Sequence, residues 1–356
     1  MDDVARRDLS AVLVTTDSEL AATVRRLCAA VGSELVVASD AVDVVRHWRH
    51  AGVVLVDALA ATELIALRLP ARPAVRVLAC GGDPLAAWQA AARLGAPGVV
   101  TLPGEEQAIA DELVLAGRPL AQRGPVVAVL PAAPGAGASV LAVGLAATAA
   151  ADRDVSLVDL DVFGGGLDLL VGLERAAGAR WSQLRGADGV LDLDELSAAL
   201  PRSGRLALLS CDRDDSAPLP AEAVTAVARA AAATSDLVVL DLPAAPDAPV
   251  ADVAVALADR VVVVVPDDLR AVAAATSVCR RVLGLGADPL LVIRRRERSR
   301  LRPAEISGAL GLPVAVTLST DRALADAADR GDLLAAARRG PNAAACRELL
   351  DALRAA

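Results

Sequence analysis

Short apolar runs alternate with amphipathic stretches along the first third of the chain. Five runs rich in Val, Leu and Ala have the length of buried strands: residues 11–15, 34–38, 52–57, 75–79 and 98–102. Four stretches between them carry apolar side chains at helical spacing: residues 18–31, 41–49, 84–94 and 105–116. Alternation of this kind predicts a parallel sheet with helices on both faces.

The rest of the chain repeats this alternation on a larger scale. Seven apolar runs predict mainly parallel strands: residues 126–130, 155–161, 205–210, 236–243, 260–266, 289–293 and 313–317. Ala-rich segments between them favour helices, as at residues 222–233 and 269–283. We therefore predict two α/β domains, over residues 1–118 and 125–356, joined by a linker at 119–124.

Composition narrows the class of protein. Of the 356 residues, 55% are hydrophobic, which excludes a disordered chain. The formal charge of −9 argues against a surface built wholly to bind nucleic acid. All 36 cationic residues are arginines, because the chain contains no lysine. The five cysteines form no CxxC pair, so we expect free thiols in a reducing cytosol.

One long uncharged stretch, residues 124–151, has the hydropathy of a membrane span. Prolines and glycines in its centre, PAAPGAGAS, would break such a helix. The first ten residues also lack the apolar core of a signal peptide. We expect a cytoplasmic protein without a transmembrane segment, with peripheral recruitment to a membrane left open.

A Gly-rich segment joins the run 126–130 to the next helical stretch. A strand, a glycine turn and a helix N-terminus together form an anion site, because free N–H groups and the helix dipole face the loop. Ser139 stands where a P-loop has its Ser or Thr, but Ala138 takes the position of its lysine. The residues expected to cradle a phosphate are Gly135, Ala136, Gly137, Ala138 and Ser139. The plain alternative is a Gly/Pro connection.

Three carboxylates are expected at the edge of the sheet that holds this loop. Asp159 and Asp161 come at the end of one predicted strand, and Asp241 lies near the end of another. Ligands bind at the carboxyl ends of parallel strands in this class, although each Asp alone is equally well a turn or a cap. A dinucleotide enzyme is an alternative, since residues 135–140 approximate GxGxxG and Asp159 follows at a suitable distance.

With these motifs the chain resembles the MinD/ParA group of deviant-Walker P-loop ATPases, most of all CpaE-like proteins and actinobacterial septum site-determining (Ssd) proteins. Residues 133–140 lie on the family motif KGGxGK[ST]T, and residues 318–331 are similar to the segment after the family's last strand. The resemblance implies that Ser139 and Asp241 hold Mg²⁺, the latter through water. It also implies that Asp159 lies near the phosphates and that Asp161 orients the attacking water.

Two departures from the motif bear on catalysis. Ala133 replaces the signature lysine that reaches the partner subunit's nucleotide, and Ala138 replaces the lysine of the β and γ phosphates. Positioning and electrostatics catalyse phosphoryl transfer, so loss of both cations predicts little or no ATP hydrolysis. ATP or ADP with Mg²⁺ is then bound weakly or not at all. Arg294 stands where the family often has an Asn for adenine.

The first domain resembles a response-regulator receiver, which has a flavodoxin-like fold and which CpaE-like proteins also have. Asp57 falls on the phosphoacceptor position. A receiver also needs an acidic pair after its first strand, a hydroxyl after its fourth and a lysine after its fifth. Here those places carry Thr15 to Asp17, Cys80 and Leu102. We therefore expect a pseudo-receiver in which Asp57 is not phosphorylated.

Six arginines gather near the end of a predicted strand of this acidic protein: Arg294, Arg295, Arg296, Arg298, Arg300 and Arg302. The plain interpretation is a solvated loop that tolerates charge reversal. The functional alternative is a patch for an acidic protein partner, a phosphate or a nucleic-acid backbone.

These expectations describe a regulator that acts by binding and localisation. The resemblance implies placement of the division septum or of pilus-type secretion machinery, with partners from that machinery and recruitment to the septum, a pole or the inner membrane face. One alternative is a slow ATPase that dimerises on nucleotide. In the main interpretation any homodimer is insensitive to nucleotide, because Ala133 removes the bridging lysine.

Overall fold

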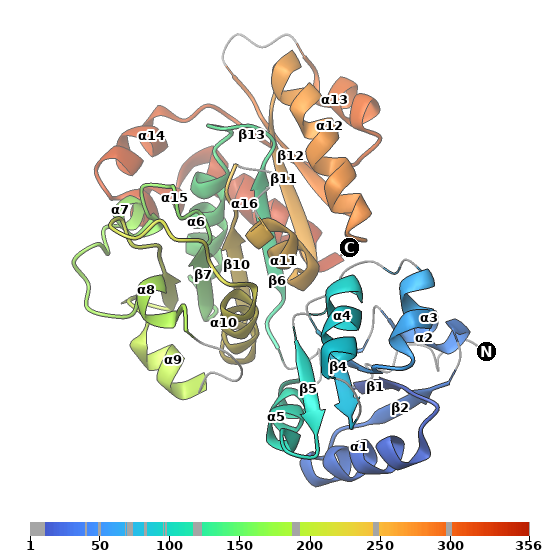
Figure 1. Cartoon of the computed structure of the whole chain (residues 1–356). Helices are drawn as coiled ribbons and strands as arrows, with labels where there is room; N and C mark the ends of the chain where they lie inside the picture. The colour runs from blue at the N-terminus through green and yellow to red at the C-terminus, as the bar shows by residue number, and fades with distance from the viewer. Residues whose placement is uncertain are drawn as a thin grey trace. The chain divides into compact units, whose positions relative to one another are not determined.

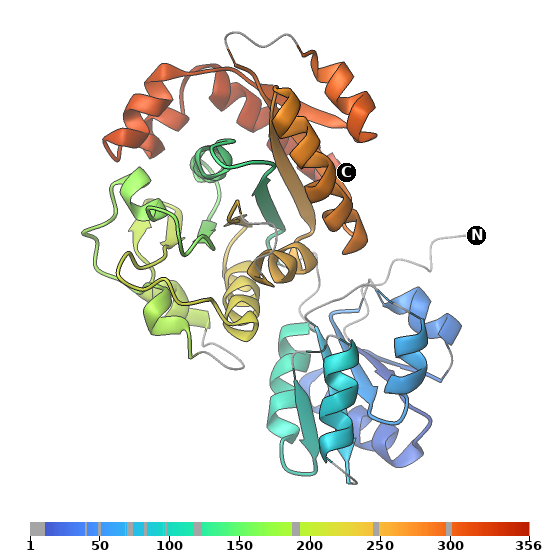
Figure 2. The ribbon, with the colours of Figure 1, turned by 45° about the horizontal axis from the view of Figure 1, so that its top comes forward.

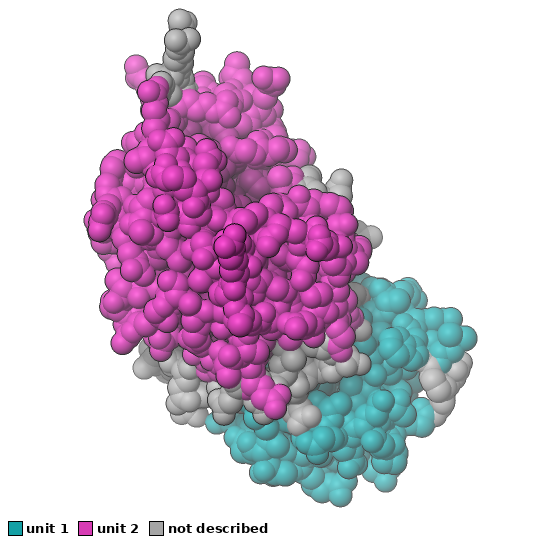
Figure 3. Space-filling model, turned by 90° about the vertical axis from the view of Figure 1, so that its left-hand side faces the viewer, with its two compact units in different colours: residues 1–123 teal, residues 124–356 magenta. Residues whose placement is uncertain are grey.

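The computed structural model describes residues 11–39, 41–48, 51–67, 69, 74–81, 84–94, 96, 98–116, 123–186, 193–244, 249–296 and 301–355. They fall into two compact units, residues 1–123 and 124–356, called the first and second unit below (Figure 3). Residues 119–122 of the predicted linker lie outside the described residues.

The first unit is built on a five-stranded parallel sheet in the flavodoxin-like order β2-β1-β3-β4-β5 (Figure 1). Its strands are β1 (Ala11–Val14), β2 (Leu35–Ala38), β3 (Val53–Asp57), β4 (Val75–Cys80) and β5 (Val99–Leu102). Its helices are α1 (Ser18–Val31), α2 (Ala41–His47), α3 (Ala61–Ala66), α4 (Pro84–Leu94) and α5 (Glu106–Ala116). Helices α1 and α5 cover one face of the sheet, and α2, α3 and α4 cover the other.

Local chemistry sets the ends of α1 in this unit. The Asp17 carboxylate accepts hydrogen bonds from the N–H groups of Glu19 and Leu20, and Gly32 ends the helix at φ +70°. These bounds agree with the sequence prediction. Helix α3 was not predicted, because its six residues are too few to show a helical period.

The second unit contains an eight-stranded sheet in the order β13-β12-β11-β6-β10-β7-β9-β8. The predicted strands are present and parallel: β6 (Val126–Pro131), β7 (Val155–Asp159), β9 (Leu206–Leu209), β10 (Leu237–Asp241), β11 (Arg260–Pro266), β12 (Pro289–Arg294) and β13 (Val314–Leu318). The eighth, β8 (Arg202–Ser203), runs antiparallel to β9 and is too short for a sequence pattern to reveal.

Helices cover both faces of this larger sheet (Figures 1 and 2). One face packs against α6 (Ala138–Ala149), α7 (Leu167–Val171), α14 (Arg322–Asp329), α15 (Leu333–Ala337) and α16 (Gly340–Ala355). The other packs against α8 (Trp181–Leu184), α9 (Leu193–Ala199), α10 (Ala221–Thr234), α11 (Pro249–Leu257), α12 (Leu269–Gly284) and α13 (Pro303–Leu310).

The uncharged stretch 124–151 is the centre of this core. It forms β6 and α6, and α6 is buried on almost every side between the sheet and α16. The packing is close, since a Cβ on Gly144 would lie 3.1 Å from the Sγ of Cys346. Its lack of charge therefore reflects burial in protein. No helix in the described ranges combines the length and apolarity that a membrane span requires.

Candidate functional site

The Gly-rich loop connects β6 to α6. Gly135 and Gly137 have φ values of +73° and +91°, which residues with a side chain rarely adopt. Helix α6 begins at Ala138, so the first N–H groups of the helix lack intrahelical acceptors and are available to an anion. The backbone therefore suits a phosphate, while the methyl group of Ala138 offers it no charge.

Three acidic residues lie around this loop. Asp159 ends β7 and Asp241 ends β10, and the two are paired directly across the neighbouring strands. Strand β10 also lies beside β6, which leads into the loop. Asp161 is two residues past the end of β7, and its N–H donates to Oδ1 of Asp159 at 3.1 Å. The structure thus brings together residues that lie up to about a hundred positions apart in sequence.

Asp159 is fully engaged by its own surroundings. Its Oδ2 accepts hydrogen bonds from the N–H of Leu167 at 2.9 Å and from the Ser210 hydroxyl at 3.1 Å. Burial raises the pKa of Asp159, and these hydrogen bonds oppose the rise. The carboxylate therefore fixes the segment after β7. This weakens the dinucleotide alternative, which needs the same oxygens for a ribose.

Asp241 differs from Asp159 in having an unsatisfied oxygen. The residue is 1% exposed, and its Oδ1 has no hydrogen-bond partner within the described part of the chain. Burial, then the charge of Asp159, raises the pKa of Asp241 well above its usual value, against an opposing interaction with Ser139. A buried orphan oxygen of this kind fits a metal-bound water, because it would supply the missing donor.

The described residues do not form a complete metal site by themselves. No group of three or more His, Cys, Asp or Glu side chains among them is placed to hold a metal ion. The Ser139 hydroxyl and the Asp241 carboxylate would hold Mg²⁺ only together with oxygens from a ligand, which is the usual manner of Mg²⁺ at phosphates.

Arg294, the last residue of β12, reaches the Gly-rich loop. Its Nη1 donates a hydrogen bond to the carbonyl oxygen of Gly135 at 3.1 Å. A Cβ on Gly137 would lie 2.7 Å from the same Nη1, so the guanidinium rests against the glycine. Sequence reasoning placed Arg294 at a base-binding position and missed this contact. The only signal for it was the position of Arg294 at a strand end, on the edge of the sheet where the loop lies.

The other described arginines of the charged run are held by acidic or backbone partners. Nε of Arg295 lies 2.9 Å from Oδ2 of Asp267, whose side chain is fully buried. Nη1 of Arg296 lies 2.9 Å from Oδ2 of Asp268, which caps α12. The expectation of a solvated loop is therefore wrong for Arg295, which pairs with a fully buried carboxylate, whereas the Arg296 side chain is 56% exposed and agrees with it.

The other arginines of that run provide little support for the predicted partner-binding patch. Arg302 precedes α13, and its backbone N–H donates to Oε2 of Glu305 at 2.7 Å. Arg298 and Arg300 lie outside the described residues. A free basic patch is thus reduced to Arg294 and Arg302 among the positions that the structure describes.

A buried polar cluster that the sequence did not predict supports the segment after β7. The Asp168 side chain, 2% exposed, pairs with Arg213 through Nη1 at 2.9 Å and with Arg180 through Nη2 at 3.3 Å. The Ser210 hydroxyl accepts a hydrogen bond from the Asp168 N–H and donates one to Asp159. No sequence pattern indicates these partners, because Asp168 lies on α7, Arg180 just before α8, and Ser210 and Arg213 after β9.

The phosphoacceptor-like residue of the first unit is internally satisfied. Oδ2 of Asp57 accepts from the Thr15 hydroxyl at 2.9 Å, and Oδ1 accepts from the N–H of Leu59 at 3.1 Å. Oδ1 of Asp17 is used to cap α1. Burial, then the charges of Asp57 and Asp17, raises the pKa of the Cys80 thiol at the end of β4. Neutral or engaged groups thus surround the carboxylate of Asp57.

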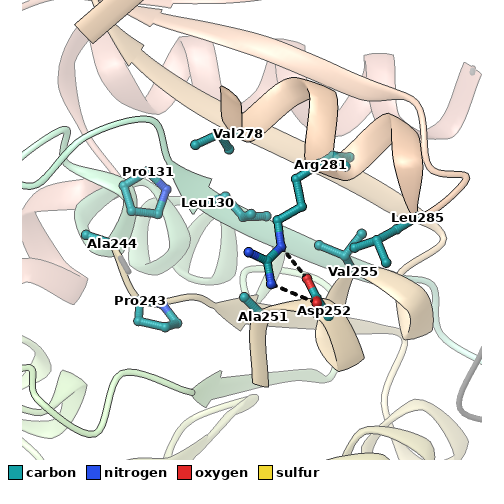
Figure 4. Close-up of a pocket in the computed structure, with 11 residues that line it drawn as sticks. Leu130, Pro131, Pro243, Ala244, Ala251, Asp252, Val255, Val278, Arg281 and Leu285 are labelled. Carbon is teal, nitrogen blue, oxygen red and sulfur yellow. Dashed lines mark hydrogen bonds and ion pairs between the residues drawn. The ribbon is translucent and has the colours of Figure 1, made fainter. Parts of the chain in front are cut away.

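A small pocket lies on the face of the large sheet away from α6, among β6, α11 and α12 (Figure 4). Arg281 crosses it and forms a two-pronged ion pair with Asp252, at 2.7 Å from Nε and 2.8 Å from Nη2. Its free volume of about 20 Å³ suits one water molecule. It is too small for a nucleotide and is distinct from the loop site.

Comparison with known sequences covers both units. Residues 14–124 match a family model described as "Rv3660c-like, CheY-like N-terminal domain". Two curated sequences of Mycobacterium tuberculosis are 37% identical over 343 residues, covering 95% of this chain and 96% of their own. They carry the descriptions "Uncharacterized protein MT3760" (strain CDC 1551) and "Uncharacterized protein Rv3660c" (strain H37Rv).

Solved structures resemble the second unit. A ParA family ATPase of Chlorobium tepidum has a TM-score of 0.56 at 19% identity, covering 65% of this chain and 98% of its own. MinD of Aquifex aeolicus has a TM-score of 0.55 at 19% identity, with the same coverage. MinD of Pyrococcus horikoshii, solved with Mg-ADP, has a TM-score of 0.56 at 16% identity, covering 64% and 95%. The chain thus combines a CheY-like first domain with a ParA/MinD-like P-loop domain.

Proposed function

This chain belongs to the family of Rv3660c of Mycobacterium tuberculosis, and we propose that it is a nucleotide-binding regulator with little or no ATPase activity. It would place the division septum or a pilus-type secretion machine by recruiting protein partners. ATP or ADP with Mg²⁺ would be its ligand.

The unsatisfied Oδ1 of Asp241 carries the proposal for nucleotide binding. It is a buried acceptor with no donor in the described part of the chain, beside a loop whose backbone N–H groups suit a phosphate. Mg²⁺ bound to a phosphate would carry a water that donates a hydrogen bond to Asp241. It would also have a free coordination position for the Ser139 hydroxyl. The Mg-ADP complex of MinD from P. horikoshii, which has the same fold, supports this choice of ligand.

Weak or absent hydrolysis follows from the charges at the loop. Ala133 and Ala138 leave the loop itself without a cation, and the chain has no lysine elsewhere to replace them. Stabilisation of the charge that develops on the phosphoryl oxygens is the main source of catalysis in such sites. Binding without turnover is therefore the favoured state.

The proposal of a localising role rests on the fold relatives. Both MinD structures are described as cell-division proteins or septum site-determining proteins, and A. aeolicus MinD has also been solved in complex with MinC. In this chain we propose that partner binding replaces catalysis as the output. Its partners would be proteins of the division or pilus/secretion machinery.

Titration calorimetry with ATP, ADP and NAD, each with and without Mg²⁺, tests the proposal. We expect Mg²⁺-dependent binding of ATP and ADP and no binding of NAD. Asp241→Asn should remove the Mg²⁺ dependence, and Ala138→Lys should tighten binding because an ammonium would meet the phosphates. Absence of nucleotide binding at millimolar concentrations, or preferred binding of NAD, would contradict the proposal.

Turnover and assembly decide between this proposal and a slow ATPase. We expect no phosphate release above the level of an Asp161→Ala variant, and light scattering that does not change with ATP. Hydrolysis that Asp161→Ala abolishes, together with an ATP-driven shift from monomer to dimer, would establish the ATPase alternative.

A further inference from the structure

Arg294 is a cation laid on an anion-binding loop. Its Nη1 donates to the Gly135 carbonyl at 3.1 Å, and the missing side chain of Gly137 makes room for the guanidinium. A Cβ at Gly137 would lie 2.7 Å from Nη1 and 3.3 Å from Cζ. The Gly-rich loop and the end of β12 are therefore in close contact, although they are far apart in sequence.

The backbone at Arg294 is held firmly, while its charge has no acidic partner among the described residues. Arg294 lies between β11 and β13, in register with Pro266 and Leu318, and its carbonyl accepts from the Asp267 N–H at 3.2 Å. The next two arginines pair with Asp267 and Asp268. Arg294 has no carboxylate partner within the described ranges, so one positive charge is directed to the loop without neutralisation.

Most of the hydrogen-bonding capacity of Arg294 is unused. A guanidinium has five N–H donors, and the carbonyl of Gly135 takes one of them among the described residues. The remaining donors form a planar fork of the kind that binds phosphate oxygens in pairs. A carbonyl is a neutral acceptor and competes poorly with a phosphate for such a donor.

Arg294 and Asp241 would interact with different groups of one ligand. Among the described residues, Arg294 hydrogen-bonds to a neutral carbonyl and has no anionic partner, and the buried Oδ1 of Asp241 lacks a donor. The loop backbone between them offers N–H groups. A nucleoside di- or triphosphate with its divalent cation satisfies all three, because its phosphates are anionic and its metal-bound waters are donors.

We propose that Arg294 is a phosphate-binding residue that replaces the loop lysine missing at Ala138. The proposal rests on the nucleotide binding proposed above and names the cation that makes it feasible. In this arrangement the charge comes from a strand end across the sheet, where the standard loop carries it on the first turn of its own helix.

Affinities for Mg-ADP and for adenosine, measured by calorimetry on the full chain, test Arg294. Arg294→Ala should weaken Mg-ADP binding by about 10- to 100-fold, the range for loss of a charge-assisted hydrogen bond. Arg294→Lys should retain part of the affinity. Adenosine, which has no phosphate, should bind the wild type and Arg294→Ala equally.

Two further variants complete the experiment. Arg354→Ala removes an equal charge from an exposed position on the last turn of α16 and should leave Mg-ADP affinity unchanged. Adding Ala138→Lys to Arg294→Ala should restore affinity, because the two cations would serve the same phosphate. Thermal unfolding of Arg294→Ala and Arg354→Ala, measured in parallel, should give the wild-type midpoint.

The possible results separate the two proposals. If the wild type binds no Mg-nucleotide, the proposed function fails. If the wild type binds but Arg294→Ala binds equally well, Arg294 has no role in phosphate binding and this inference alone fails. If Arg294→Ala binds more tightly, the guanidinium blocks the loop, which also overturns the inference.

Discussion

Asp57 in the first unit and Asp241 in the second are both carboxylates at the end of a buried parallel strand, yet their surroundings are opposite. Both oxygens of Asp57 accept hydrogen bonds, from the Thr15 hydroxyl and the Leu59 N–H. Oδ1 of Asp241 is buried and has no donor among the described residues. A carboxylate that the protein satisfies itself has no need of a cation, whereas an unsatisfied one is open to a water or a ligand.

The two units also differ in whether another cation takes the place of the lysine that each of them lacks. The first unit carries Leu102 where a receiver has lysine, and no described arginine hydrogen-bonds to Asp57. The second unit carries Ala138 in place of lysine, but Arg294 has reached the loop from another strand. Phosphate binding is therefore the proposal for the second unit, and an unphosphorylated Asp57 is the prediction for the first.

Asp267, just after β11, is a third buried carboxylate to compare with Asp57 and Asp241. Substitution of its arginine partner is expected to have the largest effect on the free energy of unfolding. Its buried carboxylate is matched by Arg295 at 2.9 Å. Arg295→Glu would place two carboxylates together in a buried position and should lower the free energy of unfolding by roughly 3 kcal/mol. Arg294→Gln, one residue earlier, should change it by less than about 0.5 kcal/mol.

Urea unfolding of these two variants measures the difference. Equal stability of Arg295→Glu and Arg294→Gln would mean that the Asp267 pair contributes nothing and that the charged run is a solvated loop after all.

Removing the charge from Asp241 and from Asp57 should have effects of opposite sign. The folded-state pKa of Asp241 is raised above the ordinary 3.8, so the stability it contributes is present at low pH and is lost as the pH rises through the raised value. Without ligand at pH 7.5, Asp241→Asn should therefore stabilise the protein by about 1–2 kcal/mol. Asp57→Asn should destabilise it by about 1 kcal/mol, because an acceptor of the Thr15 or Leu59 hydrogen bond becomes a donor.

Denaturant unfolding at pH 5 and pH 7.5 checks both signs. The gain from Asp241→Asn should be larger at pH 7.5, and saturating Mg-ADP should diminish it by stabilising the wild type more than the variant. Stabilisation by both substitutions, or by neither, would remove the distinction between the two carboxylates.

The sequence predicted the fold well because burial leaves a periodic pattern. The apolar runs gave every strand of four or more residues, and the helix over residues 18–31 was predicted with its correct bounds. Several elements were not predicted, and the shortest of them are α3, α7, α8 and β8, which have six, five, four and two residues. Elements so short are fixed by the tertiary structure around them, and they carry no period of their own.

The candidate site was less predictable, because it depends on neighbours in space. The strand-end rule brought Asp159 and Asp241 near the loop, but it could not tell that Asp159 is satisfied and Asp241 is not. That difference is made by Ser210 and by the N–H of Leu167. Arg294 reaches the loop only because β11 alone separates β12 from β6, and sheet order is not encoded in a local pattern.

A smaller effect is expected at Cys80, whose thiol reports on the charge around Asp57. Partial burial of the thiol, then the charges of Asp57 and Asp17, raises the pKa of Cys80, although the residue as a whole is exposed. Asp57→Asn should lower the pKa, increase the thiolate fraction and speed alkylation by iodoacetamide at pH 7.5 by roughly twofold to threefold. The matched variant Asp252→Asn, in the second unit, should leave the rate at Cys80 unchanged, and an unchanged rate in Asp57→Asn as well would show that the two residues do not interact.

The smallest effect is the one expected from a phosphoryl donor. Acetyl phosphate with Mg²⁺ should leave Asp57 unmodified, since its two oxygens are hydrogen-bonded and Oδ1 of Asp17 already caps α1. Leu102 also offers no charge to a phosphoryl group. Intact mass spectrometry of the wild type and of Asp57→Asn, with an authentic receiver as positive control, measures the modified fraction. A stoichiometric phosphate present on the wild type and absent from Asp57→Asn would show that ligand binding can displace Thr15. The first unit would then be a working receiver. Asp57 would differ from Asp241 only in the hydrogen bonds that each carboxylate accepts in the absence of a ligand.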